Sequence, residues 1–268
     1  MFPTLFKLGP ITIYTYGVFV FLGVIAFYFI CRRQTDKEGI ARENFSNIFF
    51  WTLIYGFIGA RIAYILVEWR WFLSNPISVA FSRSGFVFYG GVSSGILTLF
   101  ILAKKYKINF LKSADIAAVG IPLGHAFGRI GCFFYGCCYG RAIDSKWSIL
   151  FPPESPAGFG GVKVIPTQLY SAFFLVLIFF FLLFLKKHKR FNGQILLSYG
   201  ICYGIFRFII EFYRGDPRGG FFIFSTSQFV ALIVVIVSVF LFFRWRPIRQ
   251  AQGRPEQEKR VEGRRRGA

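Results

Sequence analysis

The sequence predicts an all-α, multi-pass membrane protein, a bundle of about seven transmembrane helices. Hydrophobic residues make up 55% of the 268 residues, and apolar stretches of nearly twenty residues recur along the chain. About 20 apolar residues in a helix cross the hydrocarbon core of a bilayer. The net charge of +20 comes from basic residues in short linkers between these stretches, as in membrane proteins. We therefore expect a lipid bilayer as the partner of the helices, and no nucleic acid.

Seven stretches meet this description, and we expect spans at residues 13–30, 48–67, 86–103, 114–133, 168–185, 194–212 and 222–243. The linkers after the first, third and fifth spans, together with the tail, carry 21 lysines and arginines, whereas the other three linkers carry 7. Positive loops stay in the cytoplasm. The asymmetry thus predicts an extracytoplasmic N-terminus and a cytoplasmic C-terminus, and we expect no cleaved signal peptide.

Two regions differ in composition from the spans. The linker at about 134–167 is rich in Gly and Pro and too polar to cross a membrane, so it predicts a small irregular cap on the outer side. Residues 244–268 are basic and polar, and we expect a disordered cytoplasmic tail there. Residues 1–243 then form the functional domain.

The rise of a helix per residue allows the depth of each residue in the membrane to be estimated from its position in a span. Span four enters from the cytoplasm near Ser113, so at about 1.5 Å per residue Arg129 lies about 24 Å along it, toward the outer surface. A permanent cation at this depth is costly unless a polar or anionic group meets it. The same counting places four more polar residues in the outer half: Arg61, Arg207, Tyr16 and Tyr89.

Span six carries a polar stripe. Tyr203, Arg207 and Glu211 are spaced by four and so share one helical face, where Arg207 and Glu211 can pair. Pairing lowers the cost of each charge, and the pair could serve structure alone or a functional site. Gly200 and Gly204, also four apart, predict a close approach of another helix.

Clustered guanidinium groups suit a phosphate-bearing amphiphile, because arginine binds phosphate oxygens in bidentate fashion. A nearby carboxylate and tyrosines could orient or deprotonate a second reactant. Simpler roles remain open for individual residues. Arg129 could snorkel to the interface, Tyr16 and Tyr89 could belong to an aromatic belt, Arg61 suits helix packing before ligand contact, and His125 suits a hydrogen-bonded structural role.

Three cysteines follow Arg129. Cys132, Cys137 and Cys138 have the spacing C-x4-C-C without a second pair or histidines, which is a weak metal signature. A dithiol relay is conceivable, but we favour small apolar filling of a Gly-rich turn. We expect no metal and no cofactor.

Motifs along the whole chain up to the tail resemble one known family, the prolipoprotein diacylglyceryl transferases. They are Tyr16-Gly17, Gly59-Ala60-Arg61, Tyr89-Gly90-Gly91, Asp115, Gly128-Arg129-Ile130-Gly131, Gly136, Gly140-Arg141, Pro166-Thr167-Gln168-Leu169-Tyr170, the run 207–214 (RFIIEFYR) and Ser227-Gln228.

The resemblance implies a bacterial inner-membrane enzyme. Its reaction would transfer the diacylglyceryl group of phosphatidylglycerol to the lipobox cysteine of a prolipoprotein signal peptide, forming a thioether and releasing glycerol phosphate. The catalytic residues would be Arg129, Arg207, Glu211, Tyr89 and Tyr16. The phosphatidylglycerol-binding residues would be Arg129, Arg207, Arg61, Tyr203 and Gly140.

This sequence departs from the best-known members at three positions. Tyr89 stands where they have a histidine, proposed there as the base, and Cys132 and Cys137 stand where they have asparagine and glutamate. A tyrosine is a poor base at neutral pH unless its pKa is shifted. The base could instead be His125 or Glu211, or the thiol could ionise without one. Two other classes remain as alternatives: a non-enzymatic phospholipid-binding or transport protein, and a thiol oxidoreductase that uses Cys137 and Cys138.

Overall fold

The computed structural model describes residues 4–9, 11–82, 85–158, 160–215, 220–221 and 224–265. The chain forms two compact units. The first unit comprises Met1–Ile30 and Ala117–Ala268, and the second comprises Cys31–Ile116. Two long helices, α1 (Thr15–Lys37) and α6 (Phe110–Tyr135), each begin in one unit and end in the other.

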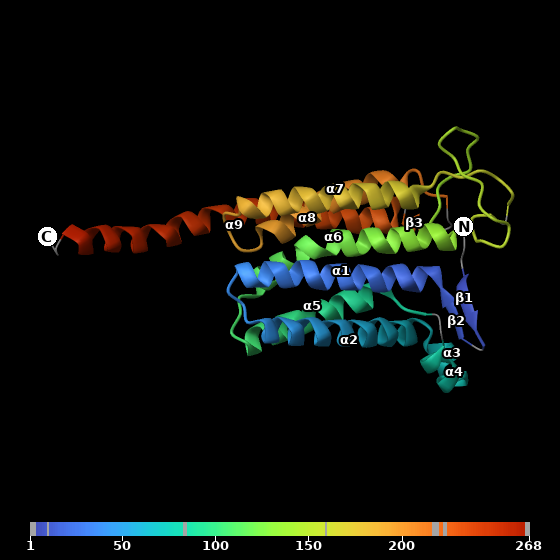
Figure 1. Cartoon of the computed structure of the whole chain (residues 1–268), viewed down its shortest axis with the longest axis horizontal. Helices are drawn as coiled ribbons and strands as arrows, with labels where there is room; N and C mark the ends of the chain where they lie inside the picture. Colours follow the sequence, from blue (N-terminus) through green and yellow to red (C-terminus); the bar gives the residue numbers. More distant parts are fainter. Residues whose placement is uncertain are drawn as a thin grey trace. The chain divides into compact units, whose positions relative to one another are not determined.

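The second unit is built on a pair of helices, α2 (Arg42–Val67) and α5 (Phe88–Lys105), which run side by side (Figure 1). The short helices α3 (Trp69–Ser74) and α4 (Pro76–Phe81) connect them. Glycines allow the pair to pack closely. A Cβ atom at Gly59 would lie 2.0 Å from Oγ of Ser94, and one at Gly90 would lie 2.3 Å from Cβ of Ala63. Small residues at such a crossing let two backbones approach in a membrane.

The first unit is a helical bundle with two short hairpins. Its elements, besides the parts of α1 and α6, are β1 (Thr4–Leu8), β2 (Ile11–Tyr14), α7 (Thr167–Lys187), α8 (Gln194–Glu211), β3 (Gly220–Phe221), β4 (Phe224–Ser225) and α9 (Thr226–Arg265). Strands β1 and β2 pair antiparallel, as do β3 and β4.

The core of the first unit lies where α6, α7 and α8 meet. Val119 of α6, Leu182 of α7 and Ile195 of α8 belong to one buried cluster and are fully enclosed. The expected close approach at Gly200 and Gly204 is confirmed, and the partner helix is α9. Cβ atoms at these glycines would lie 2.4 Å from Oγ of Ser238 and 2.6 Å from Cγ2 of Val235.

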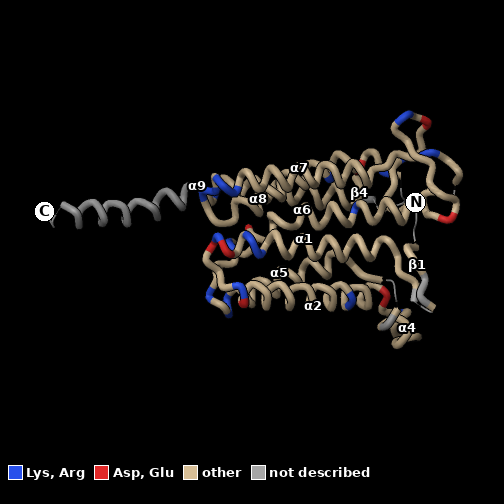
Figure 2. Tube along the Cα trace, in the orientation of Figure 1, with Lys and Arg blue, Asp and Glu red and all other residues tan. Residues whose placement is uncertain are grey.

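The predicted fold class is confirmed. Within the described residues, six helices are long and apolar enough to cross a membrane: α1, α2, α6, α7, α8 and α9 up to Trp245. The other expected span coincides with α5, which has 18 residues and ends on two lysines. Figure 2 shows charged residues mostly at the ends of the helices, with long uncharged stretches between them. The chain is therefore a multi-pass membrane protein.

The boundaries differ from the expected ones in a few places. Residues 13 and 14 belong to strand β2 rather than to the first span, and neither short hairpin was anticipated. The expected start of the seventh span, at 222–223, lies outside the described residues. The expected domain boundary at residue 244 falls inside α9, and the separate disordered tail stays a prediction.

The segment between α6 and α7 is the expected irregular region. Its described residues form bends, turns and isolated bridges, such as Ala142 with Val164 and Ile149 with Val164 (Figure 1). It has a small core of its own, in which Phe151, Ala157 and Val164 are buried. Its assignment to the outer side of the membrane stays a prediction.

Candidate functional site

The polar stripe of α8 contains a buried ion pair. Nη1 of Arg207 lies 2.7 Å from Oε2 of Glu211, and the two side chains are only 11% and 5% exposed. Nη2 of Arg207 also donates a hydrogen bond of 2.9 Å to Oγ of Ser227, near the start of α9. The expected pairing of these two residues is thus confirmed. The guanidinium of Arg207 is held from two sides, which fixes its orientation.

The carboxylate of Glu211 has further partners. Nε of Arg214 lies 3.9 Å from Oε2, and Oγ of Ser225 donates a hydrogen bond of 3.0 Å to Oε1. Gln228 in turn braces Ser225, since its Oε1 accepts a 3.0 Å hydrogen bond from the Ser225 backbone N–H. Oε1 of Glu211 thus accepts a hydrogen bond, and Oε2 lies within ion-pair distance of two guanidinium groups. This carboxylate links two arginines and the β4–α9 turn.

Arg129 is positioned from α6. Its Nε–H donates a hydrogen bond of 3.3 Å to Nε2 of His125, one turn earlier on the same helix. The ring of His125 lies 5.3 Å from that of Tyr203, which stacks on Tyr199 at 5.5 Å. The stripe of α8 therefore faces the turn of α6 that carries Arg129.

The charges of Arg129 and Arg207 interact with each other, and both act on His125. Arg207 has a carboxylate partner, whereas among the described residues no carboxylate lies within ion-pair distance of Arg129. Two guanidinium groups balanced by one carboxylate, which Arg214 also approaches, leave an excess of positive charge. This excess suits an anionic ligand.

Tyr16 lies at the start of α1, beside the end of α6. Its ring centroid is 6.5 Å from that of Tyr135, and a Cβ atom at Gly131 would lie 3.2 Å from the Tyr16 ring. The charge of Arg129 acts on the Tyr16 hydroxyl. The structure thus brings Tyr16, Arg129, Tyr203, Arg207 and Glu211 into one unit.

Gly140 has a packing role in the structure. A Cβ atom there would lie 2.7 Å both from Cβ of Ile165 and from the carbonyl oxygen of Tyr213. Gly140 forms an isolated bridge with Arg214, and Arg141 N–H donates a 2.9 Å hydrogen bond to the Tyr213 carbonyl. The absence of a side chain thus lets this loop contact the segment that carries Arg214. Contact of Gly140 with a ligand stays a prediction.

Arg61 and Tyr89 lie in the second unit. The Arg61 guanidinium donates hydrogen bonds to four backbone carbonyls, two at the end of α4 and two in the connection to α5, among them those of Ala80 at 3.0 Å and Gly85 at 2.8 Å. Arg61 therefore holds this connection in place. Tyr89, in the first turn of α5, is 53% exposed. The expected roles of both residues toward a substrate stay predictions.

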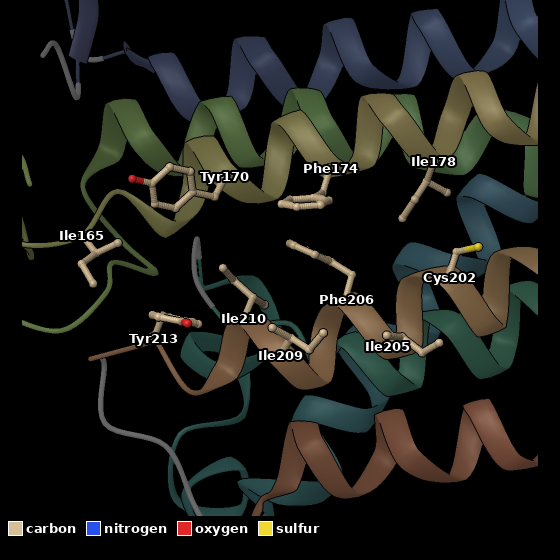
Figure 3. Close-up of a pocket in the computed structure, with 10 residues that line it drawn as sticks. All are labelled: Ile165, Tyr170, Phe174, Ile178, Cys202, Ile205, Phe206, Ile209, Ile210 and Tyr213. Carbon is tan, nitrogen blue, oxygen red and sulfur yellow. The ribbon is translucent and has the colours of Figure 1, made fainter. Parts of the chain in front are cut away.

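An apolar pocket of about 510 Å³ lies along the other side of α8, against α7 (Figure 3). Ile165, Tyr170 and Tyr213 lie at one end of it, and Cys202 and Ile205 lie toward the other. Its lining is almost wholly hydrophobic, which suits hydrocarbon. The pocket is composed of residues 165, 170, 174, 178, 202, 205, 206, 209, 210 and 213.

Sequence reasoning gave no specific role to three residues of this site. Arg214 and Ser227 were named only within motifs of the family resemblance, and Ser225 was not named, although each contacts Glu211 or Arg207. The spacing of three between Glu211 and Arg214 was a usable signal, because residues three apart share a helical face. No sequence signal indicates Ser225, because it reaches the site through the β4–α9 turn.

The thiol of Cys138 adjoins the site. Hydrogen bonds with the thiols of Cys132 and Cys137 lower the pKa of Cys138, and the guanidinium of Arg214 lowers it further, while burial raises it. The positive charge of Arg214 thus acts on a thiol at the edge of the site.

Comparison with known proteins places these residues in a family context. Residues 3–244 match the family model described as prolipoprotein diacylglyceryl transferase. A Clostridium tetani protein named phosphatidylglycerol–prolipoprotein diacylglyceryl transferase is 35% identical over 242 residues, 90% of this chain and 97% of its own. A Clostridium perfringens relative, whose name is the same with the suffix 2, is 36% identical over 246 residues, 91% of this chain and 94% of its own. A Geobacter sulfurreducens relative with the first of these names is 36% identical over 217 residues, 79% of this chain and 82% of its own.

Proposed function

The chain belongs to the prolipoprotein diacylglyceryl transferase family, and from this premise we propose that Arg129 and Arg207 bind the phosphate of phosphatidylglycerol during the transfer. The chain is a membrane transferase that moves a diacylglyceryl group from phosphatidylglycerol to a prolipoprotein. The observation that carries the assignment of the two arginines is their convergence from α6 and α8, with an excess of positive charge between them.

The chemistry follows from the bond that must break. The thiolate sulfur of the prolipoprotein's lipobox cysteine attacks the glyceryl carbon and forms a C–S bond, while the C–O bond to phosphate breaks. The electron pair goes to the phosphate oxygen, and glycerol phosphate leaves. Arg129 and Arg207 stabilise the negative charge that grows on this oxygen, and prepositioned donors of this kind are the main source of catalysis in such a step.

The contacts of Glu211 and His125 support a mechanism in which neither residue acts as the base that deprotonates the thiol. Oε2 of Glu211 lies within ion-pair distance of two guanidinium groups, and Nε2 of His125 accepts a hydrogen bond from Arg129. We infer that the incoming thiol loses its proton to solvent because the two guanidinium groups lower its pKa as it binds. Tyr16 and Tyr203 orient the substrates, and we propose that Tyr89 has the same role.

The acyl chains of the lipid need apolar surface beside this polar site. The pocket between α7 and α8 offers such surface, and two of its residues, Ile210 and Tyr213, flank Glu211 and Arg214 in the sequence. We assign the chain to the bacterial inner membrane, with the N-terminus outside and the C-terminus in the cytoplasm. The bias of basic residues supports this orientation. The relatives do not favour the lipid-binding or oxidoreductase alternatives.

The test is transfer of a labelled diacylglyceryl group from phosphatidylglycerol to a lipobox peptide by the purified protein. We expect product with the wild type and its loss in both Arg129→Ala and Arg207→Ala. Arg42→Ala is the matched control, because it removes an arginine that pairs with Asp36 at an exposed position. Product that survives both site substitutions would refute the assignment of the arginines. Phospholipid binding without product in the wild type would instead refute the activity.

A further inference from the structure

Three of the five cysteines converge where α6 ends. The sulfur atoms of Cys132, Cys137 and Cys138 all lie within 4.8 Å of one another, and no disulfide joins any cysteine of the described structure. The proposed transfer uses none of these thiols. Their spacing in the sequence led us to expect packing alone, because it lacks a second pair of ligands. The structure shows that this one segment supplies three sulfurs by itself.

The backbone is bent to bring these sulfurs together. Gly136 has a φ of 80° and Cys138 has a φ of 63°, so the chain enters the left-handed region twice within three residues. A residue with a side chain rarely adopts that conformation, and it persists where the surroundings enforce it. The backbone N–H of Cys137 also donates to the carbonyl of Cys132 at 3.1 Å. This turn returns residues 137 and 138 to the end of the helix.

Two buried residues of α7 hold the turn from outside. Oγ1 of Thr167 donates a hydrogen bond of 2.9 Å to the Cys138 carbonyl, and Nε2 of Gln168 donates one of 2.7 Å to the Cys137 carbonyl. Both side chains are almost fully enclosed. Oε1 of Gln168 is buried as well, and no donor for it exists in the described part of the chain. The turn is thus rigidly supported and lies beside one unsatisfied acceptor.

Two guanidinium groups make the charge around the three sulfurs positive. The charge of Arg214, whose side chain is 4% exposed, acts on Cys138, and that of Arg129 acts on Cys132. Metal ions bind cysteine as thiolate. Three thiolates around a divalent ion would leave a single negative charge, which the two nearby guanidinium groups can balance.

We propose that Cys132, Cys137 and Cys138 form a binding site for a thiophilic d¹⁰ cation, either Zn²⁺ or Cu⁺. Thiolate sulfur selects these ions over hard cations. Zinc–sulfur bonds of about 2.3 Å place two sulfurs of a tetrahedral site about 3.8 Å apart, so each pair here needs to close by no more than about 1 Å. A bound ion would tie the end of α6, which carries Arg129, to the loop that carries Gly140.

The test is titration of the reduced, full-length protein in detergent with Cd²⁺, whose thiolate complexes absorb in the ultraviolet. We expect one ion per chain, displaced by Zn²⁺. Cys132→Ser, Cys137→Ser and Cys138→Ser should each weaken binding by more than about 100-fold, because loss of an outer partner alone costs about 10- to 100-fold. Cys31→Ser and Cys202→Ser are the controls and should bind as the wild type does, because neither cysteine belongs to the cluster.

A second measurement needs no variant. The number of cysteines alkylated by iodoacetamide, read from the intact mass, should fall by three when the wild type is loaded with Zn²⁺. Equal Cd²⁺ affinity in all five variants would overturn the proposal. Unchanged alkylation with Zn²⁺ would overturn it too, as would a disulfide between two of the three cysteines that persists under the reducing conditions of the titration.

Discussion

On helix α8, the guanidinium of Arg207 and the carboxylate of Glu211 lie one turn apart, with 2.7 Å between Nη1 and Oε2. The same carboxylate oxygen lies 3.9 Å from Nε of Arg214. Glu211 is therefore shared by two buried guanidinium groups. Such a carboxylate stabilises the folded protein because it compensates the charge of both guanidinium groups. Its removal leaves Arg207 and Arg214 without an anionic partner.

We predict that Glu211→Gln lowers both stability and activity. Removing one partner of a buried ion pair costs about 3 to 5 kcal/mol, because the charge that remains is uncompensated. The apparent melting temperature in detergent and the rate of diacylglyceryl transfer should both fall. Asp36→Asn, which breaks an exposed ion pair with Arg42, should leave the melting temperature nearly unchanged. Equal shifts in the two variants would contradict the role given to Glu211.

Arg61 is predicted to act on local structure first. Arg61→Lys keeps the charge but cannot reach four carbonyls with a planar fork, so the connection between α4 and α5 should loosen. Hydrogen exchange of residues 79–82 and 85–87 should speed up, while exchange in α7 stays as it is in the wild type. If exchange is unaltered and only KM for phosphatidylglycerol rises, Arg61 is a ligand residue instead.

Much of the fold could be predicted from the sequence because a bilayer imposes simple rules. Length and apolarity located the helices, and the spacing of Tyr203, Arg207 and Glu211 located the stripe and its ion pair. These features depend on helical periodicity alone. The hairpin of β1 and β2 was not predicted, because its strands are too short for an alternating pattern of apolar and polar residues to be recognised.

The parts of the site that could not be predicted depend on turns. Ser225 reaches Glu211 through the β4–α9 turn, and the three sulfurs meet in a turn where Gly136 and Cys138 both adopt a positive φ. A residue with a side chain rarely adopts that conformation, so no propensity rule points to it. Spacing along the chain likewise could not show that Arg61 binds backbone carbonyls.

Gly140 is predicted to tolerate no side chain. In Gly140→Ala the added methyl group would meet Ile165 and the Tyr213 carbonyl at 2.7 Å, so the loop must move away from Arg214. Overpacking of this kind costs about 1 to 3 kcal/mol. Thermal unfolding and transfer activity report the loss. Gly160→Ala in the same loop is the control, because its added Cβ would meet Val162 at an ordinary 3.6 Å. Unfolding at the same temperature in both variants would argue against this packing.

Arg129→Lys tests the geometry of phosphate binding apart from charge. Lysine keeps the positive charge but loses the planar fork and the hydrogen bond to His125. One charge-assisted hydrogen bond is worth about 1.5 to 3 kcal/mol, so kcat/KM should fall about 10- to 100-fold. Steady-state transfer assays with labelled phosphatidylglycerol measure this change. A lysine variant as active as the wild type would mean that Arg129 contributes its positive charge and not a specific hydrogen-bonding geometry.

Substitution of Tyr89 tests whether the enzyme has a dedicated general base. Its hydroxyl belongs to a half-exposed side chain in the first turn of α5, a position that suits contact with a substrate without proton transfer. Tyr89→Phe should therefore reduce kcat by less than about tenfold, whereas loss of a general base costs about 10²- to 10⁴-fold. The kcat of the wild type and of Tyr89→Phe should be compared at pH 7 and at pH 9. If the substrate thiol ionises without a base, the transfer rate should rise with pH equally in both proteins. A large loss of kcat at pH 7 in Tyr89→Phe would indicate that Tyr89 is the base. It would contradict the proposal that the two arginines alone promote ionisation of the thiol.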